Sequence, residues 1–196
     1  MSTNRLEAFS DGVFAIAITL LVLEFRVPAS DGAQVGGDLL KLWPSFLAYI
    51  VSFGTLGVIW VNHHAVVDKT RGADRALLFL NLLLMATDAF IPFPTSVLAQ
   101  HLLHDGEQVA AAFYAASLLM MAIGFALVTR HAIRAGLMDA PAYRAPRRMR
   151  VVNLGLILYP VAIAVAFLSP LVSVALCIAV AVYYALPPRP SDSREP

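Results

Sequence analysis

The first long apolar run of this chain constrains its fold more than any other feature. Residues 5–24 begin polar and then continue from Gly12 to Leu23 with Thr19 as the one polar side chain. A helix on the surface of a soluble protein would carry a charged face over such a run, so this helix belongs in lipid or in the core of a bundle. Asp11 directly precedes the run. An ionisable side chain at that depth is costly, which indicates a functional or assembly role.

The composition of the whole chain supports a membrane location. Of its 196 residues, 59% are hydrophobic and 14% are charged, whereas globular chains have about 45–50% and about 25%. A water-soluble fold of this size could not bury so much apolar surface. We therefore predict an all-α, polytopic membrane protein with one domain, residues 1–186, followed by a disordered polar tail, residues 187–196.

Six segments qualify as membrane-spanning helices, for which about 20 mostly apolar residues are needed. Their predicted ranges are 6–25, 39–67, 75–99, 108–129, 151–168 and 171–186. Pro92 and Pro94 lie in the second half of the third segment. No convincing internal repeat relates the two halves of the chain, which argues against an inverted-repeat transporter.

The distribution of basic residues predicts the orientation of the helices. With six spans, 12 of the 14 Lys and Arg residues lie on the side of the N-terminus, and the other two are Arg26 and Lys41. The positive-inside rule then places both termini in the cytoplasm and residues 26–38 outside. We interpret the arginine-rich connection at residues 130–150 as a topology signal. Binding of acidic lipid or of nucleic acid is the less favoured alternative, and we predict no nucleic-acid partner.

Helical spacing sorts the side chains of the first predicted helix into faces. Gly12, Ile16, Leu20 and Leu23 are spaced by 4, 4 and 3 residues, so they form one stripe with Thr19 at its edge. From the residues alone, such a stripe is usually a core or lipid contact. The Thr19 hydroxyl can bond a backbone carbonyl one turn earlier, or it can face a pore.

Several polar side chains of the first three predicted helices lie at a similar depth. At about 1.5 Å per residue, Asp11 lies roughly 9 Å in from Arg5, and the polar residues of the next two helices lie about as far from the same side. In lipid each of them needs a partner, and they can serve one another. The predicted network comprises Arg5, Ser10, Asp11, Asn62, His63 and Asn81. Sensing of pH through a histidine and separate residues at the lipid edge are the alternatives.

The remaining ionisable residues favour neither a metal site nor an enzyme. His63 and His64 are adjacent and point about 100° apart on a helix, so one metal ion would not easily bind both, and we predict no metal and no cofactor. No hydrolase or metalloprotease motif is present. Asp88 lies near the middle of the third helix, where it either caps the turn broken by Pro92 or faces a water-filled crevice on the outer side. We favour the structural role.

Three short motifs resemble those of the transmembrane protein 175 family, which comprises potassium-permeable channels of lysosomes and bacteria. They are Arg5-x-x-x-Phe9-Ser10-Asp11 followed by Ala17-Ile18-Thr19-Leu20, Trp60-x-Asn62-His63-His64, and Ile91-Pro92-Phe93-Pro94-Thr95. Beyond about Gln100 the chain shares only a compatible topology. The resemblance implies a passive, potassium-preferring channel in a bacterial plasma membrane, with the polar network holding the first helix from behind.

The resemblance also implies how such a channel would be built. Four first helices of a homotetramer would surround the pore, with Ile16, Leu20 and Leu23 forming a hydrophobic constriction that gates by dewetting. Potassium would be the permeant ion and the lipid bilayer the other partner. The chain has no Thr-Val-Gly-Tyr-Gly loop, so selectivity would come from side chains, with Thr19 as the candidate. A proton-coupled or proton-conducting transporter that uses Asp11, Asp88 and the histidines is the alternative.

Overall fold

The structure is a computed structural model that describes residues 3–25, 35–138 and 146–186, with side chains described from residue 154 onward in the last segment. The described residues are almost entirely helical, which confirms the predicted all-α class. The helices are α1 (Thr3–Leu20), the 3-10 turn η1 (Leu21–Glu24), α2 (Val35–Lys41), α3 (Trp43–Val67), α4 (Arg75–Phe90), α5 (Pro92–His101), α6 (Glu107–Arg134), α8 (Pro146–Ala166) and α9 (Pro170–Ala185).

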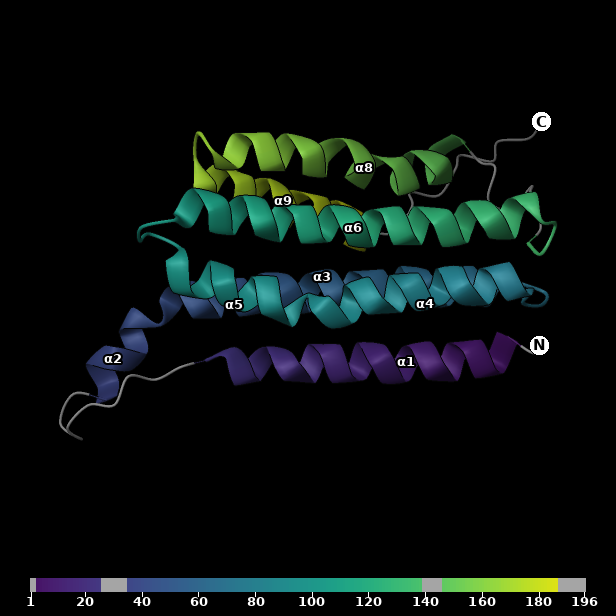
Figure 1. Ribbon diagram of the computed structural model, residues 1–196, viewed down its shortest axis with the longest axis horizontal. Helices are drawn as coiled ribbons and strands as arrows, with labels where there is room; N and C mark the ends of the chain where they lie inside the picture. The colour runs from purple at the N-terminus through teal and green to yellow at the C-terminus, as the bar shows by residue number, and fades with distance from the viewer. Residues whose placement is uncertain (1–2, 26–34, 139–145, 187–196) are drawn as a thin grey trace, which may run out of the picture.

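The long helices lie side by side and run in alternating directions along the long axis of the molecule (Figure 1). The start of α1 and the connection between α3 and α4 lie at one end, which we call the Thr3 end. The end of η1 and the turn between α5 and α6 lie at the other, which we call the Glu24 end. Helix α1 occupies one edge of the bundle and packs on α3 and α4, whereas α6 lies in the centre and contacts α4, α5, α8 and α9.

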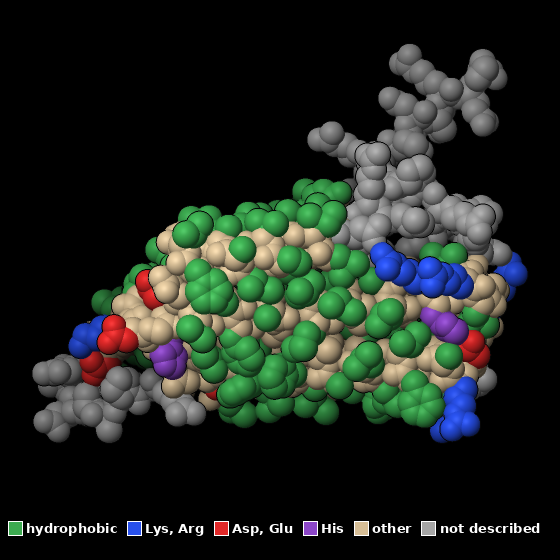
Figure 2. All heavy atoms as spheres, turned by 45° about the horizontal axis from the view of Figure 1, so that its top comes forward, with side chains coloured by type: hydrophobic (Ala, Val, Ile, Leu, Met, Phe, Trp, Pro, Cys, Tyr) green, Lys and Arg blue, Asp and Glu red, His purple; other side chains and the backbone are tan. Residues whose placement is uncertain are grey.

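The surface matches a bundle that crosses a bilayer. Apolar side chains cover the flank seen in Figure 2, whereas the charged side chains gather at its two ends. Four described helical stretches are long and apolar enough to span a membrane: Thr3–Glu24, Trp43–Val67, Arg75–His101 and Glu107–Arg134. Two shorter apolar helices, Leu154–Ala166 and Pro170–Ala185, complete the bundle.

Two of the six predicted segments are each divided into two helices. The segment predicted to start at residue 39 has a boundary at Leu42, and the third segment is broken at Ile91. Pro44 and Pro92 explain the breaks, because proline has no N–H to donate and is favoured in the first turn of a new helix. Helix α6 continues five residues past its predicted end at residue 129. The expected outer loop at residues 26–34, the connection at residues 139–145 and the tail at residues 187–196 lie outside the described residues.

Small side chains let α6 approach its neighbours closely. Alanine and glycine are frequent on its buried face, as is usual where helices pack within a membrane. A Cβ added at Gly124 would lie 3.2 Å from the Cα of Leu84 on α4. Glycine at this position therefore allows the close approach of α6 to α4, the helix against which α1 packs.

Candidate pore helix and the polar contacts behind it

Helix α1 has one buried face and one exposed apolar face. The buried face carries Leu6, Ser10, Phe14, Ala17 and, in η1, Leu21, spaced by 4, 4, 3 and 4 residues. This spacing repeats one helix face, which lies against α3 and α4 along α1 and against α3 and α5 at η1. The opposite face is apolar as well and is uncovered in a single copy of the chain.

The predicted pore stripe lies on that exposed face. The exposed fraction is 61% for Ile16, 40% for Leu20 and 70% for Leu23, and Gly12 and Thr19 are also exposed. The Thr19 Oγ1 donates a hydrogen bond to the carbonyl oxygen of Ile16 at 2.9 Å. The hydroxyl thus makes the backbone bond that a threonine inside a helix commonly makes, and its oxygen still has a lone pair to offer.

Three of the six predicted network residues form a continuous relay behind α1. The His63 Nε2 lies 2.8 Å from the Asn81 Oδ1, and the Asn81 Nδ2 donates to the Ser10 Oγ at 3.0 Å. Ser10 in turn donates to the Leu6 carbonyl oxygen at 2.9 Å. Because the Asn81 amide nitrogen already donates to Ser10, its oxygen accepts from His63, which requires the proton of the imidazole on Nε2. All three side chains are buried, and the relay joins α1, α3 and α4.

Asp11 bonds a residue outside the predicted network. It accepts a hydrogen bond from the indole Nε1 of Trp60 at 2.8 Å, instead of bonding His63 or Asn81. One turn nearer the Thr3 end, the Nδ1 of His64 lies 2.9 Å from the Glu7 Oε1. Residues four apart share a helix face, so these two contacts form parallel links between α1 and α3. Trp60 belongs to a motif identified in the sequence, whereas no pattern in the sequence singles out Glu7.

The other two predicted network residues do not join the relay. The Asn62 Nδ2 donates to the Val58 carbonyl oxygen at 2.8 Å, one turn earlier in its own helix. Arg5 is exposed near the start of α1.

The short Gly54–Gly57 sequence lies within α3, where Thr55 donates to the Val51 carbonyl oxygen at 2.7 Å. It therefore offers no row of free backbone carbonyls to an ion.

A second buried polar cluster joins α3, α5 and α6 in the half nearer the Glu24 end. The Ser52 Oγ lies 2.8 Å from the Thr95 Oγ1 and 2.9 Å from the Tyr114 hydroxyl. Thr95 also donates to the Ile91 carbonyl oxygen at 2.8 Å. These hydroxyls fasten the start of α5 just after the break at Ile91.

Asp88 is buried without any such contact. It is 0% exposed, and neither carboxylate oxygen has a hydrogen-bond partner among the described residues. At the break, the Ile91 N–H donates to the backbone carbonyl oxygen of Asp88 at 3.1 Å, so the main chain of Asp88 closes the turn and its side chain does not. The predicted capping role is therefore filled by the backbone.

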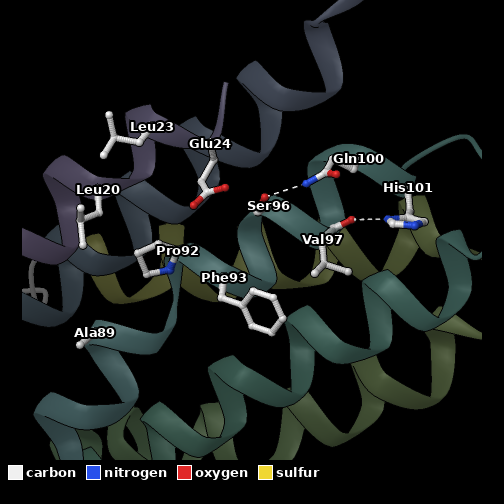
Figure 3. Close-up of a pocket in the computed structure, with 10 residues that line it drawn as sticks. All are labelled: Leu20, Leu23, Glu24, Ala89, Pro92, Phe93, Ser96, Val97, Gln100 and His101. Atoms are coloured by element: carbon white, nitrogen blue, oxygen red, sulfur yellow. Dashed lines mark hydrogen bonds between the residues drawn. The ribbon is translucent and has the colours of Figure 1, made fainter. Parts of the chain in front are cut away.

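A cleft opens beside the second half of α1, which we call the Glu24 cleft (Figure 3). Its volume is about 530 Å³, and its walls come from α1 with η1 on one side and from the α4–α5 break with α5 on the other. The lining residues are Leu20, Leu23, Glu24, Ala89, Pro92, Phe93, Ser96, Val97, Gln100 and His101. Two predicted pore residues thus border the cleft, and its polar groups lie toward the Glu24 end, where Gln100 donates to Ser96 at 2.8 Å.

An acid–imidazole pair ties α4 to α6 at the Thr3 end. Asp74 accepts from the Leu77 N–H at 2.7 Å as the N-cap of α4, and its Oδ2 lies 2.8 Å from the His131 Nε2. The Leu77 N–H, and then His131, lower the pKa of Asp74. The stability from these contacts is therefore present above the ordinary pKa of aspartate and is lost as the pH falls through the lowered value.

Among the described residues, no three His, Cys, Asp or Glu side chains are grouped as a metal site would need.

Comparison with known proteins places this architecture among potassium channels. The family model described as endosomal/lysosomal potassium channel TMEM175 matches residues 5–92. A potassium channel of Streptomyces collinus is 44% identical over 98% of this chain and 96% of its own length. The crystal structure of a lysosomal potassium-selective channel TMEM175 homolog from Chamaesiphon minutus superposes with a TM-score of 0.85 at 41% identity, covering 93% of this chain and 96% of that one.

A human relative carries a different functional name. The Homo sapiens protein named endosomal/lysosomal proton channel TMEM175 is 40% identical over 47% of this chain, a match that covers 20% of the human protein. The similarity to it is therefore partial, whereas the similarity to the two bacterial proteins extends over nearly the full length of each chain.

Proposed function

This chain belongs to the TMEM175 family of potassium channels, and we propose that it conducts potassium passively through a pore lined by α1 from four copies of the chain. The single observation that carries the proposal is the exposed apolar face of α1. Membership of an ion-channel family also agrees with the prediction that the chain is not an enzyme.

The position of α1 supports an oligomer. The helix lies at one edge of the bundle, with its buried face against α3 and α4 and its stripe uncovered. One copy has a single such stripe and so cannot enclose an ion path with it. A closed ring of identical copies is the usual way to complete such a site. We therefore propose a homotetramer with the stripe toward the axis.

Each ring of side chains has a proposed role. Ile16, Leu20 and Leu23 form the hydrophobic constriction, which stops ions when it dries. Thr19 supplies a ring of hydroxyl oxygens between the apolar rings, and these offset part of the cost of removing water from potassium. No carbonyl filter is needed in this design. The relay through Ser10, Asn81 and His63 holds α1 from behind and does not touch the ion.

Potassium flux from liposomes tests the proposal. Purified protein should release potassium down its gradient, and Ile16→Asn should raise the leak several-fold because a polar ring wets the constriction. The matched control is Ile50→Asn on α3, since Ile50 is 64% exposed and so resembles Ile16 in exposure. If the two variants leaked equally, the stripe would face lipid and the proposed pore would be wrong.

The proposed orientation has both termini in the cytoplasm of a bacterium. It rests on the distribution of 12 basic residues on one side and two on the other. Single cysteines introduced at Ala33 and at Ala145, which lie outside the described residues, should react with a membrane-impermeant reagent from opposite sides. The native Cys177 is 1% exposed and gives little background. Labelling of both sites from the same side would rule out the orientation.

Proton conduction is the second candidate, and the name of the human relative favours it. In this alternative Asp11, Asp88 and the histidines carry protons. A pH-sensitive dye inside the same liposomes distinguishes the two functions, because a potassium channel needs an added protonophore before internal pH changes at full rate. A fast pH change without protonophore would favour the proton path.

A further inference from the structure

We propose that Asp88 is a buried proton-binding site, loaded from the Glu24 cleft, whose ionisation requires the α4–α5 break to open. The effect on conduction rests on the function proposed above, whereas the proton site itself does not. Asp88 takes no part in the relay or in the proposed pore. Its buried carboxyl group therefore needs an explanation of its own.

Asp88 lies midway along its helical span. It is 13 residues after Arg75 and 13 before His101, so it is about 20 Å from either end of the span. It shares one buried face of α4 with Leu84, which lies against Gly124 of α6. On the same face, Asn81 has both of its amide atoms hydrogen-bonded, whereas Asp88 has neither oxygen bonded among the described residues.

Among the described residues, no charge on a neighbouring helix compensates for this burial. The charged and titratable side chains of the elements around α4 lie toward the ends of those elements, apart from Asp11, which bonds Trp60, and Tyr114, which bonds Ser52. They are Arg5, Glu7 and Asp11 on α1, Glu24 on η1, His101 on α5, Glu107, Tyr114, Arg130, His131 and Arg134 on α6, and Tyr49, His63 and His64 on α3, where His63 bonds Asn81. A carboxylate left unpaired in such a place is far costlier than the neutral acid, so the conformation described here holds Asp88 as –COOH.

The break beside Asp88 offers the route for the proton. Pro92, one turn later, has no N–H for the Asp88 carbonyl oxygen, so the helix is already interrupted here. Ala89 and Pro92 both line the Glu24 cleft. When the break opens toward the cleft, the O–H bond of Asp88 breaks, the electron pair stays on the carboxylate, and the proton passes to water there.

The same movement would act on the candidate pore helix. The cleft is walled on one side by the break and on the other by Leu20, Leu23 and Glu24. η1 packs against α5, which begins at the break. Low pH on the Glu24 side, the outer side in the proposed orientation, would keep Asp88 neutral and the break closed, and high pH would favour the opened break and a displaced η1.

Thermal unfolding against pH tests the proton site without reference to conduction. Because the folded state prefers the acid, the stability that Asp88 contributes is present at low pH and is lost as the pH rises. The Tm of wild-type protein in detergent should therefore fall from about pH 5 to about pH 9 by roughly 3–5 °C for each tenfold preference for the acid, relative to Asp88→Asn, which cannot ionise. Asp105→Asn, an exposed carboxylate in the turn after α5, should keep the wild-type slope.

Parallel slopes for wild type and Asp88→Asn would overturn the site. If Asp88→Asn does not fold, Asp88→Leu, which has a similar volume and cannot titrate, replaces it. The infrared carbonyl band of a neutral carboxylic acid in wild-type protein at pH 7 should also disappear in whichever variant folds, and its persistence there would likewise overturn the site.

Potassium flux with only the external pH varied tests the coupling. The flux of wild type should change with external pH, and that of Asp88→Asn should not. Equal responses would overturn the coupling to η1. An absence of potassium flux from wild-type protein at every pH would instead refute the proposed function, and the melting curves would still decide whether Asp88 binds the proton.

Discussion

The two halves of α1 are held in very different ways. The first half, residues 3–14, is fastened to α3 and α4 by the relay from Ser10 and by the links from Asp11 and Glu7. The second half, residues 15–24 with η1, has no described side-chain hydrogen bond to another helix. It is held by apolar contacts of Ala17 and Leu21, and it borders the Glu24 cleft.

In the proposed channel, this difference separates stability from conduction along a single helix. Buried hydrogen bonds between helices fix the position of the first half, because breaking one strands its partner in a low-dielectric site. The second half can change its contacts at lower cost, since apolar side chains have no partner to lose. Substitutions in the first half should therefore lower stability and leave selectivity unchanged. Substitutions in the second half should change selectivity and leave stability nearly unchanged.

The largest expected effect comes from breaking the relay. Asn81→Leu leaves the His63 N–H without an acceptor and removes a donor from Ser10, at a cost of roughly 2–3 kcal/mol, or a fall of roughly 4–12 °C in Tm. Thermal unfolding of purified protein measures the loss. Asn62→Leu is the matched control, because that amide bonds its own helix. An equal loss in the two variants would show that the relay does not hold α1.

A smaller effect is expected at the link between Asp11 and Trp60. Asp11→Ala should cost about 1 kcal/mol, since the indole N–H loses its acceptor in a partly exposed site, and Asp11→Asn should keep most of the stability through its remaining oxygen. In a Trp60→Phe background, Asp11→Ala should cost little more. Additive losses in this cycle would mean that the two side chains do not stabilise each other. We expect the potassium-to-sodium permeability ratio to stay the same in Asp11→Ala.

The smallest effect on stability, and the clearest on selectivity, is expected at Thr19. Thr19→Ala should lower the potassium-to-sodium permeability ratio a few-fold while conduction persists, and Thr19→Ser should largely keep the ratio. Reversal potentials under bi-ionic conditions measure it. Thr87→Ala is the matched control, because Thr87 makes the same type of backbone bond on α4. If Thr19→Ala left the ratio unchanged, the Thr19 hydroxyl would have no role in selectivity, and its only role would be the bond to the Ile16 carbonyl oxygen.

Much of the fold followed from the sequence because the membrane simplifies the problem. A bilayer requires helices of a given apolar length, so hydropathy located every long helix that the structure describes. The breaks at Leu42 and Ile91 were harder to place. A proline inside an apolar run is compatible with a kinked helix or with a new one, and only the packing of the following turn decides between them. The extension of α6 past residue 129 was missed because polar residues such as Arg130 and Arg134 can continue a helix beyond the lipid.

The sequence predicted how deep the residues of the candidate site lie along their helices, but only partly where their side chains point. The rise per residue is constant, so counting along three helices brought Ser10, His63 and Asn81 to one level. Which side chains meet depends on the rotation of each helix and on the reach of each side chain. The indole of Trp60 is long enough to reach Asp11, so counting placed Asp11 against the second predicted helix without identifying the side chain that it meets. Thr95 belongs to a motif, but nothing in the sequence pairs it with Ser52 and Tyr114, because that contact needs three helices to be placed first.

The 3-10 winding of η1 sets how the last apolar residues of α1 line up. Successive residues rotate by about 120° in a 3-10 helix and by about 100° in an α-helix, so residues three apart eclipse one another only in the former. Leu23 lies in this turn and Leu20 directly precedes it, so ideal 3-10 winding would align these two residues in one column. Rewinding Leu21–Glu24 into α-helical form would swing Leu23 by about 60° and shorten the helix by about 2 Å. A change of winding over these four residues would thus rotate the Leu23 side chain about the helix axis without moving the hydrogen-bonded first half of α1.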